Sequence, residues 1–304
     1  MAKARRKASG PSPVPAAHGR YEYSAIVDRP PLRWPNGARV ALWVIPNIEH
    51  FLFNRPSTSL ASIGPLNPDI RNYSWRDYGV RVGIWRMMEI MERYKIKGTV
   101  ALNSDVCREY PRIIEEGKKL GWEWMGHGIT NSIIINAQAE KEERALIKEV
   151  VTTITRSVGK APRGWLGPAL SETVNTLDIL AENGIEYVGD WVNDDQPYPM
   201  EVRKGTMFAM PYSQEINDIP AMLGLHRSPE EFGQMICDQF DVLYEDGAKT
   251  GRVMSICLHP FLVGHPHRSK YFAKALAHIT SRDEVWMTTG SEILDWYKKN
   301  YWQR

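Results

Sequence analysis

The sequence predicts an α/β fold in the form of a single (β/α) barrel, and three observations lead to this prediction. Short apolar runs alternate with segments of helical periodicity about seven times along the chain. The runs are apolar almost throughout, as in strands that are covered on both faces of a parallel sheet. At 304 residues, with 43% hydrophobic and 24% charged residues, the chain suits one large globular domain.

The N-terminus is expected to lie outside this domain. It begins with a basic stretch, and residues 9–15 are rich in serine and proline, so they do not resemble the apolar core of a signal peptide. We therefore predict a flexible arm over residues 1–20 and one barrel domain over residues 21–304.

In the first half of the chain, five elements follow one another in the order expected of a parallel sheet. Residues 39–46 are apolar almost throughout, whereas residues 77–94 repeat their apolar side chains at helical spacing. Pro111 suits the first turn of the next helix. The predicted strands are 39–46, 97–103 and 120–125, and the predicted helices are 77–94 and 111–120.

In the second half the alternation continues. Residues 137–158 form a long predicted helix with three glutamates near its start, where negative charge stabilises the helix dipole. Residues 163–168 are expected to form a glycine and proline turn. The predicted strands are 186–188, 207–210, 252–257 and 284–288, and the predicted helices are 137–158, 174–183, 230–244, 270–278 and 291–301.

Residues 55–75 are rich in Pro, Ser, Asn and Gly, and this segment is too long for an ordinary connection. Such a segment is typical of a lid or of a subunit contact. We expect it to cover the mouth of its own barrel or of a neighbouring subunit's barrel in a homo-oligomer, either a dimer or a tetramer.

The charge of the chain and its cysteine content indicate which partners and which cellular compartment to expect. The net charge is +2 and the basic residues are scattered among acidic ones, so nucleic acid is not expected as a partner. Three cysteines without a framework spacing indicate free thiols in a reducing compartment. No apolar run approaches the roughly 18 residues that span a bilayer. We predict a cytoplasmic protein that binds a small molecule.

Polar side chains follow the predicted strands, and the ends of parallel barrel strands meet at one mouth. Carboxylates, imidazoles and an arginine together suit hydrolysis, which needs a base for water, an acid for the leaving group and donors for an oxyanion. The clusters are Asn47 and Glu49, Asn103 and Asp105, His127 and Asn131, Arg163 and Trp165, Asp190 and Trp191, Glu215 with Asn217 and Asp218, and His259.

For two of these residues, the sequence is also explained without any function when each residue is considered alone. His127 stands between Gly126 and Gly128 at the end of a strand, where it can face a ligand or be a hydrogen-bonded core residue. Glu49 is equally explained as a solvated loop carboxylate. The second histidine turn, at His259, favours a functional site.

These motifs, in this order, resemble the polysaccharide deacetylase (NodB-homology) superfamily over about residues 38–301. They are most similar to its branch of allantoinase and cyclic-imide hydrolase type. Asn47 and Glu49 stand where the superfamily has an aspartate pair, and residues 126–131 stand where it has two metal-binding histidines. Residues 163–165, 189–191 and 257–259 look like its arginine, aspartate-tryptophan and leucine-histidine motifs. The resemblance implies a distorted (β/α)7-type barrel.

In the metal-dependent deacetylases of this superfamily an aspartate and two histidines hold the metal, but here Asn131 replaces the second histidine. An amide oxygen is a poor zinc ligand beside imidazole or thiolate. We therefore expect no tight metal centre. A weak divalent site, for example for zinc, stays open on His127 and Glu49, completed by His259 or Asp105.

The resemblance implies a hydrolase of non-peptide carbon–nitrogen bonds that acts on a small, cyclic amide such as an imide, a hydantoin or a ureide. Two alternatives stay open: a metal-dependent deacetylase of an N-acetylated sugar or polysaccharide, and a catalytically inactive ligand-binding barrel. In the main hypothesis Glu49 is the general base or a metal ligand, His127 orients water or substrate, His259 protonates the leaving nitrogen and Arg163 fixes the acid partner. Asp190 completes the catalytic set, and the residues expected to bind substrate are Asn47, Asp105, Asn131, Trp165, Trp191, Glu215 and Asn217.

Overall fold

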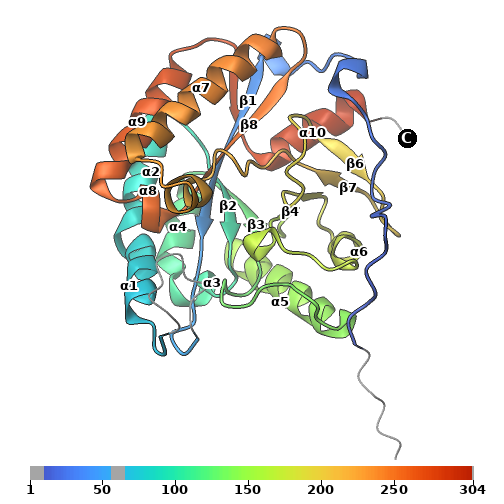
Figure 1. Ribbon diagram of the computed structural model, residues 1–304, viewed down its shortest axis with the longest axis vertical. Coiled ribbons are helices and arrows are strands. Elements are labelled where there is room, and N and C mark those ends of the chain that lie inside the picture. Colours follow the sequence, from blue (N-terminus) through green and yellow to red (C-terminus); the bar gives the residue numbers. More distant parts are fainter. Residues whose placement is uncertain (1–9, 56–65, 303–304) are drawn as a thin grey trace, which may run out of the picture.

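The computed structural model describes residues 10–55 and 66–302 and confirms the α/β barrel prediction as a curled, open half-barrel (Figure 1). The hydrogen-bonded path of the described sheet runs in the order β6-β7-β5-β4-β3-β2-β1-β8, with β9 paired to β1. The strands are β1 Val40–Ile48, β2 Thr99–Leu102, β3 Glu123–Gly126, β4 Gly164–Trp165, β5 Tyr187–Val188, β6 Tyr198–Met200, β7 Met207–Ala209, β8 Arg252–Leu258 and β9 Val285–Thr288.

The strands of this sheet are parallel except for β6, which pairs antiparallel with β7. Along one edge, β1 is shared between two neighbours, because its first residues pair with β9 and its last two pair with β2. Its other edge pairs with β8 over seven residues. Parallel pairing brings the carboxyl ends of β1, β2, β3 and β8 to the same rim of the half-barrel.

Helices cover the outer face of the sheet, with α7 and α9 packed together beside β1 and β8 (Figure 1). The helices are α1 Ile70–Tyr78, α2 Ile84–Arg93, α3 Val106–Glu109, α4 Pro111–Lys119, α5 Glu140–Val158, α6 Thr176–Glu182, α7 Pro229–Gly247, α8 Pro260–Val263, α9 Pro266–Thr280 and α10 Gly290–Tyr301. Single turns of 3-10 or π geometry lie at Ile26–Asp28, Pro35–Gly37, Gly79–Gly83, Pro168–Leu170 and Ile219–Gly224.

The two faces of β1 divide the core into two layers. Val40, Leu42 and Val44 belong to the outer layer beneath the helices, whereas Trp43 and Ile45 belong to the inner layer. The inner layer also contains Ile293 and Leu294 of α10, which lies between the β1–β8 pair and the β6–β7 pair in Figure 1. This alternation has the period of two that a strand imposes on its side chains.

Three local features differ from the sequence prediction. The expected turn at 163–168 contains β4, whose two residues are too few to show a strand pattern. The edge strand β6 was not predicted, because Pro199 interrupts its sequence; proline is tolerated on a sheet edge. The helix expected at 77–94 starts earlier, at Ile70, and continues through a π-helical turn.

The predicted arm and the 55–75 segment are described only in part. Residues 1–9 and 56–65 lie outside the described residues, and the second range is part of the predicted lid or subunit contact. At the end of the arm, the Arg20 side chain donates to the Val174 carbonyl at 2.7 Å and to Asp178 at 3.1 Å. Within the described ranges, no helix is both long and apolar enough to cross a membrane.

Candidate active site

A cavity of about 510 Å³ opens at the carboxyl ends of β1, β3 and β8. Its wall combines one carboxylate, two imidazoles, one guanidinium and several amides with apolar side chains, as in small-molecule sites. The lining residues are Asn47, Glu49, Phe51, Arg76, His127, Asn131, Ile134, Leu166, Gly167, Ala169, Leu170, Tyr212, Gln214, Asn217, Ile219, Pro220 and His259.

The polar residues of this cavity continue the inward-facing positions of their strands. Met125 of β3 and Cys257 of β8 belong to the inner layer, and each is followed two residues later by a histidine. Because side chains alternate along a strand, His127 and His259 point to the same side as these core residues. The same spacing leads from Ile45 through Asn47 to Glu49. The inner core layer is therefore continuous with the wall of the cavity.

Glu49 lies between the two histidines. Its Oε1 atom is 3.6 Å from Nε2 of His127 and 3.5 Å from Nε2 of His259. Burial by itself raises the pKa of Glu49, but the charge of His259 and the close approach of both imidazoles outweigh burial, so the pKa lies well below its usual value. Glu49 is ionised at any pH near neutrality.

His259 is held by Asp218, which is completely buried. The Nδ1 atom of the ring lies 2.7 Å from Oδ1 of Asp218, and the backbone N–H of His259 donates to Oδ2 at 2.7 Å. Burial favours the neutral ring, yet the charges of Asp218 and Glu49 raise the pKa of His259 to about 9. The imidazole is therefore protonated at neutral pH and directs Nε2–H toward Glu49.

His127 is fixed through its other nitrogen. Its Nδ1 atom donates to the Leu166 carbonyl at 2.6 Å, because a carbonyl oxygen accepts and cannot donate. Nε2 has no hydrogen-bond partner within 3.5 Å among the described atoms, and it faces Glu49 across the cavity. A water or a substrate group bound there would complete the hydrogen bonding of His127.

Asn131 occupies the position where the second metal histidine was expected, and a chain of amides determines how it is oriented. The backbone N–H of His50 donates to Oδ1 of Asn103 at 2.9 Å, which identifies this atom as the amide oxygen. The NH2 group of Asn103 is therefore free to act as the donor in its other hydrogen bonds. That NH2 group donates to the His127 carbonyl and, at 2.9 Å, to Oδ1 of Asn131. The NH2 group of Asn131 is then left to donate to Glu49.

This orientation fits a metal poorly. A ligand must offer a lone pair, but Asn131 presents N–H groups, and its oxygen already accepts from Asn103. Within residues 10–55 and 66–302, no group of three or more His, Cys, Asp or Glu side chains is arranged to hold a metal ion. Asp105, a predicted completing ligand, interacts with His50 and Arg108 instead. The donor set therefore disagrees with the metal centre that the superfamily implies.

The structure brings six of the predicted site residues into the cavity and leaves six outside. Those inside are Asn47, Glu49, His127, Asn131, Asn217 and His259. Those outside are Asp105, Arg163, Trp165, Asp190, Trp191 and Glu215, and each of these corrects the expectation that every cluster would converge on the mouth.

Arg163 is the largest of these corrections. It precedes β4 and so lies at the amino end of the strand, opposite the rim that carries the histidines. Its guanidinium forms ion pairs with Glu186 at 2.6 Å and with Asp295 of α10 at 2.6 Å. Both carboxylates raise the pKa of Arg163 further above its usual value. Arg163 ties β4 to α10 and does not touch the cavity.

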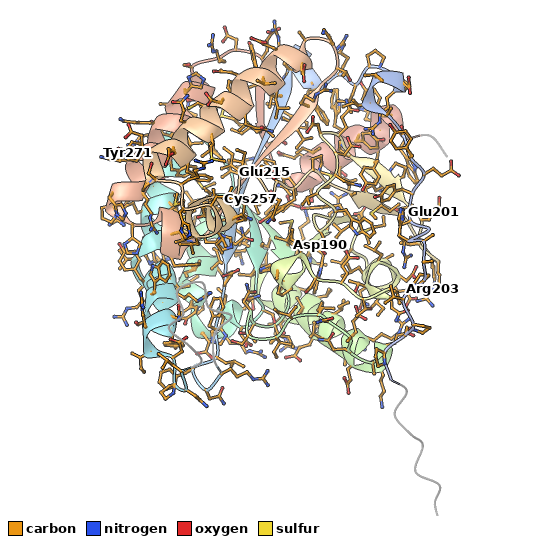
Figure 2. The ribbon with its side chains drawn as sticks, viewed as in Figure 1. Asp190, Glu201, Arg203, Glu215, Cys257 and Tyr271 are labelled. Carbon is orange, nitrogen blue, oxygen red and sulfur yellow. The ribbon has the colours of Figure 1, made fainter. Side chains whose placement is uncertain are left out.

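Asp190 lies behind the cavity wall. Its Oδ1 atom accepts the backbone N–H of Gly167, a lining residue, at 2.7 Å. Burial raises the pKa of Asp190 to about 7, and burial together with Asp190 raises that of Glu172 well above its usual value. Asp190 appears near the centre of Figure 2. It is placed to shape the loop that lines the cavity, without reaching the substrate space.

The two tryptophans and Glu215 also have other surroundings. Trp165 is completely buried in the outer core layer, because its position on β4 faces the helices. Trp191 donates from Nε1 to Glu172 at 3.3 Å and packs edge-on against Tyr21. Glu215, labelled in Figure 2, is exposed on the loop after β7, while Asn217 of that loop lines the cavity.

Several lining residues were not predicted as site residues from the sequence, among them Phe51, Arg76 and Leu170. Arg76 is the most consequential, because it brings a buried positive charge into the site from α1. Its helix gave no amphipathic signal, since Asn72 and Arg76 are the buried residues of α1. A buried polar stripe at helical spacing would have been the only signal available.

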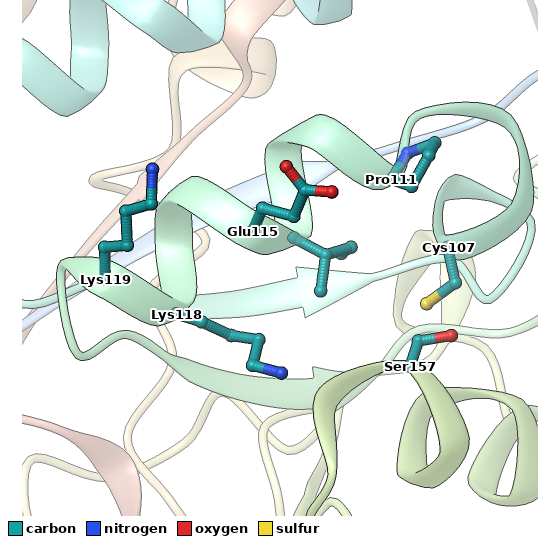
Figure 3. A pocket seen from close by; sticks show the side chains of 7 residues that line it. Cys107, Pro111, Glu115, Lys118, Lys119 and Ser157 are labelled. Atoms are coloured by element: carbon teal, nitrogen blue, oxygen red, sulfur yellow. The ribbon is translucent and has the colours of Figure 1, made fainter.

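A second cavity of about 530 Å³ lies on the outer surface beside α4 and α5 (Figure 3). It holds Cys107 and Ser157 at its inner end and the exposed Lys118 and Lys119 at its rim. Burial raises the pKa of the Cys107 thiol, which makes the thiolate scarce at neutral pH. These residues do not form a site comparable to the first cavity.

The comparisons with known proteins agree with the fold. Residues 74–188 match the family model for polysaccharide deacetylase, a stretch that includes His127 and Asn131 but not Glu49 or His259. The chain is 27% identical over 290 residues to a Schizosaccharomyces pombe protein whose name is polysaccharide deacetylase, covering 86% of this chain and 90% of the relative. It is 25% identical over 256 residues to a Helicobacter pylori protein named peptidoglycan deacetylase, covering 72% of this chain and 84% of the relative.

Solved structures give the same result for the fold. A probable polysaccharide deacetylase of Pseudomonas aeruginosa PAO1 superposes with a TM-score of 0.83 at 26% identity, over 91% of this chain and 96% of that one. The Puue allantoinase superposes with a TM-score of 0.81 at 24% identity, over 91% and 96% of the two chains, and shows the fold alone. The names support the deacetylase alternative better than the cyclic-amide hypothesis. Residues 74–188 thus match a polysaccharide deacetylase (NodB-homology) domain, the relatives with that name extend the similarity over most of the chain, and the members of that family are hydrolases of carbon–nitrogen bonds.

Proposed function

We propose that this chain hydrolyses the carbon–nitrogen bond of a small non-peptide amide, with an imidazolium and a carboxylate in place of a metal. The observation that carries this proposal is the placement of Glu49 between His127 and protonated His259 in the wall of the cavity. One ionised acceptor and one charged donor, 3.5 Å apart, are what acid–base hydrolysis of an amide requires.

In this mechanism Glu49 and Nε2 of His127 hold the attacking water, and Glu49 accepts its proton. The low pKa of Glu49 makes it a weak base while His259 is charged, because His259 is the main attraction on it. When His259 gives its proton to the leaving nitrogen, that attraction disappears and Glu49 becomes the better base. The two proton transfers therefore assist each other.

The substrate class we place first is a small amide, including the imides, hydantoins and ureides. Two features support it: the cavity holds about 510 Å³, which suits a small molecule, and Asn131 offers an N–H donor where a metal ligand was expected. Ring amides present alternating carbonyl and N–H groups that Asn47, Asn131 and Asn217 can pair with.

Deacetylation of an N-acetylated sugar or polysaccharide is the second candidate, and the names of the relatives favour it. An acetamido group is also a small amide, so the same acid–base pair applies. The two candidates differ in the remainder of the substrate and in the need for a metal.

The test is a panel assay on the full chain, before and after dialysis against chelator, with hydantoins, imides, ureides and acetylated glucosamine oligomers. We expect turnover of a small amide that survives chelation and falls about 100- to 10,000-fold in Glu49→Gln. The matched control is Glu215→Gln, an exposed carboxylate that is next to the lining residue Gln214 but does not itself line the cavity. Tightly bound stoichiometric zinc, with activity on acetylated sugars alone that chelation abolishes, would overturn the proposal.

A further inference from the structure

One peptide group, between Leu166 and Gly167, joins His127 of the active site to Asp190 behind it. Its carbonyl oxygen lies 2.6 Å from Nδ1 of His127, and its N–H donates to Oδ1 of Asp190 at 2.7 Å. Asp190 is labelled near the centre of Figure 2 and does not line the cavity. Because a peptide group is planar and rigid, the position of Asp190 is linked directly to the hydrogen bond of the imidazole.

The sheet and a glycine together make this contact. Gly167 and Asp190 lie two residues beyond the paired residues Trp165 and Val188, so they extend the register of β4 and β5 past the strand ends. A Cβ atom at Gly167 would lie 2.4 Å from the carbonyl oxygen of Ser171 and 3.2 Å from Oδ2 of Asp190. The first distance is too short for any side chain. Glycine therefore allows the loop to close over the carboxyl group of Asp190.

The carboxyl group of Glu172 lies next to that of Asp190 and determines where their proton resides. Burial raises the pKa of Glu172, and the charge of Asp190 raises it further, so Glu172 is neutral. Burial raises the pKa of Asp190 to about 7, while the Gly167 N–H and Glu172 oppose this shift. Since a backbone N–H only donates, Oδ1 of Asp190 accepts from Gly167 in either protonation state.

At His127 two acceptors compete for the ring proton. The Leu166 carbonyl faces Nδ1, and a carboxylate oxygen of Glu49 lies 3.6 Å from Nε2. The stronger hydrogen bond decides which nitrogen is protonated. The bond to Asp190 polarises the peptide group and strengthens its carbonyl as an acceptor, because hydrogen bonds in a chain reinforce one another. This favours the tautomer with the proton on Nδ1 and a lone pair on Nε2.

The tautomer matters for the attacking water that Glu49 and His127 hold. A water that donates one O–H to Glu49 and the other to Nε2 keeps a lone pair of its oxygen for the carbonyl carbon. A proton on Nε2 would instead be donated to Glu49 or to the water oxygen, and would occupy the base or the nucleophile. The competing explanation is that Asp190 only fastens the 167–172 loop, in which case its loss leaves the tautomer unchanged.

We propose that Asp190 is a positioning residue that fixes the tautomer of His127 through the Leu166–Gly167 peptide group, so that Nε2 faces the cavity as an acceptor. The catalytic consequence of this inference rests on the proposed amide hydrolysis. The position of the proton on His127, in contrast, is measured without turnover.

The first test is nitrogen NMR of the full chain labelled with 15N at histidine, in which the His127 signal is identified by its absence in His127→Gln. We expect the proton on Nδ1 in wild type and in Asp190→Asn, whose amide oxygen still accepts from Gly167. In Asp190→Ala the proton should move toward Nε2. The control is Asp195→Ala, because Asp195 lies in the same loop and is 3.7 Å from Arg252. A proton on Nε2 in wild type, or the wild-type tautomer in Asp190→Ala, would overturn the assignment.

The second test is kinetic and separates this inference from the proposed function. We expect kcat to fall about 10- to 100-fold in Asp190→Ala with little change in KM, as for the loss of a group that orients an active-site histidine. Asp190→Asn and Asp195→Ala should stay close to wild type. If Asp190→Ala does not fold, Asp190→Leu fills the same space without an acceptor. A changed tautomer with wild-type kcat refutes the positioning role, whereas a tautomer that depends on Asp190 in a chain that turns over no amide refutes the proposed function instead.

Discussion

Asp218 holds His259 at two points, with one carboxylate oxygen 2.7 Å from the ring Nδ1 and the other 2.7 Å from the backbone nitrogen. This bidentate contact fixes both the ring plane and the tautomer, so that Nε2–H faces Glu49. Because Asp218 is completely buried, its charge acts on the ring without screening by solvent. The proposed general acid is thus oriented and charged before any substrate binds.

The first prediction is the pH dependence of hydrolysis. The proposed mechanism needs His259 protonated and Glu49 ionised. The pKa of His259 is raised to about 9 and that of Glu49 is lowered, so both conditions hold from weakly acidic pH up to about 9. We expect kcat/KM to be flat across this range and to fall about tenfold per pH unit above pH 9. A rate that increases through pH 9 would contradict the assignment of His259 as the acid.

The same shift has a consequence for stability with a defined sign. The pKa of His259 in the folded protein lies above the ordinary value of 6.5, so its ion pairs stabilise the fold fully below pH 6.5. This contribution is lost as pH rises through about 9. Thermal melts should therefore show Tm decreasing between pH 7 and 10, and less so in His259→Gln.

The second prediction concerns Asp218→Asn, which keeps the shape of the side chain and removes its charge. We expect the pKa of His259 to fall, so that the alkaline limb of the rate profile moves down by about one pH unit or more, and kcat to fall at least about tenfold. Asp241→Asn is a matched control, because Asp241 contacts His278 at 2.8 Å in an exposed pair. An unchanged profile in Asp218→Asn would show that Asp218 does not set the charge of the acid.

The third prediction tests the amide chain that ends at Asn131. Asn131→His replaces an N–H donor by an imidazole nitrogen, so bound zinc should increase. Turnover should not improve, because Glu49 loses the hydrogen bond from Asn131 and faces a cation. Zinc stoichiometry and turnover are compared with Asn136→His, an exposed position on the same loop. Wild-type protein that already holds one tight zinc per chain would contradict the interpretation of Asn131.

The fourth prediction tests whether Arg163 stabilises the fold without taking part in catalysis. Arg163→Met removes the ion pairs with Glu186 and Asp295, which should cost about 1 kcal/mol of unfolding free energy because the pairs are partly exposed. Turnover at saturating substrate should stay within about twofold of wild type. A hundredfold loss of kcat with an unchanged Tm would return Arg163 to the catalytic set.

The sequence alone determined the parts of this protein that depend on local pattern. Apolar runs such as the one in β1 identify buried strands, and helical periodicity identifies α2, because each pattern lies within a few consecutive residues. The positions just after strands led to Glu49, His127 and His259, since the carboxyl ends of parallel strands share a rim.

Only the tertiary structure decided which polar clusters meet. Arg163 stands one residue before a two-residue strand, and so short a strand has no pattern that distinguishes its amino end from its carboxyl end. Arg76 enters the cavity from a helix whose buried face is polar, which is the reverse of the pattern that identifies a core helix. The orientation of Asn131 depends on a hydrogen-bond chain that begins at the backbone of His50, in the loop that follows β1. Such contacts are set by the packing of distant segments, and no local pattern in the sequence encodes them.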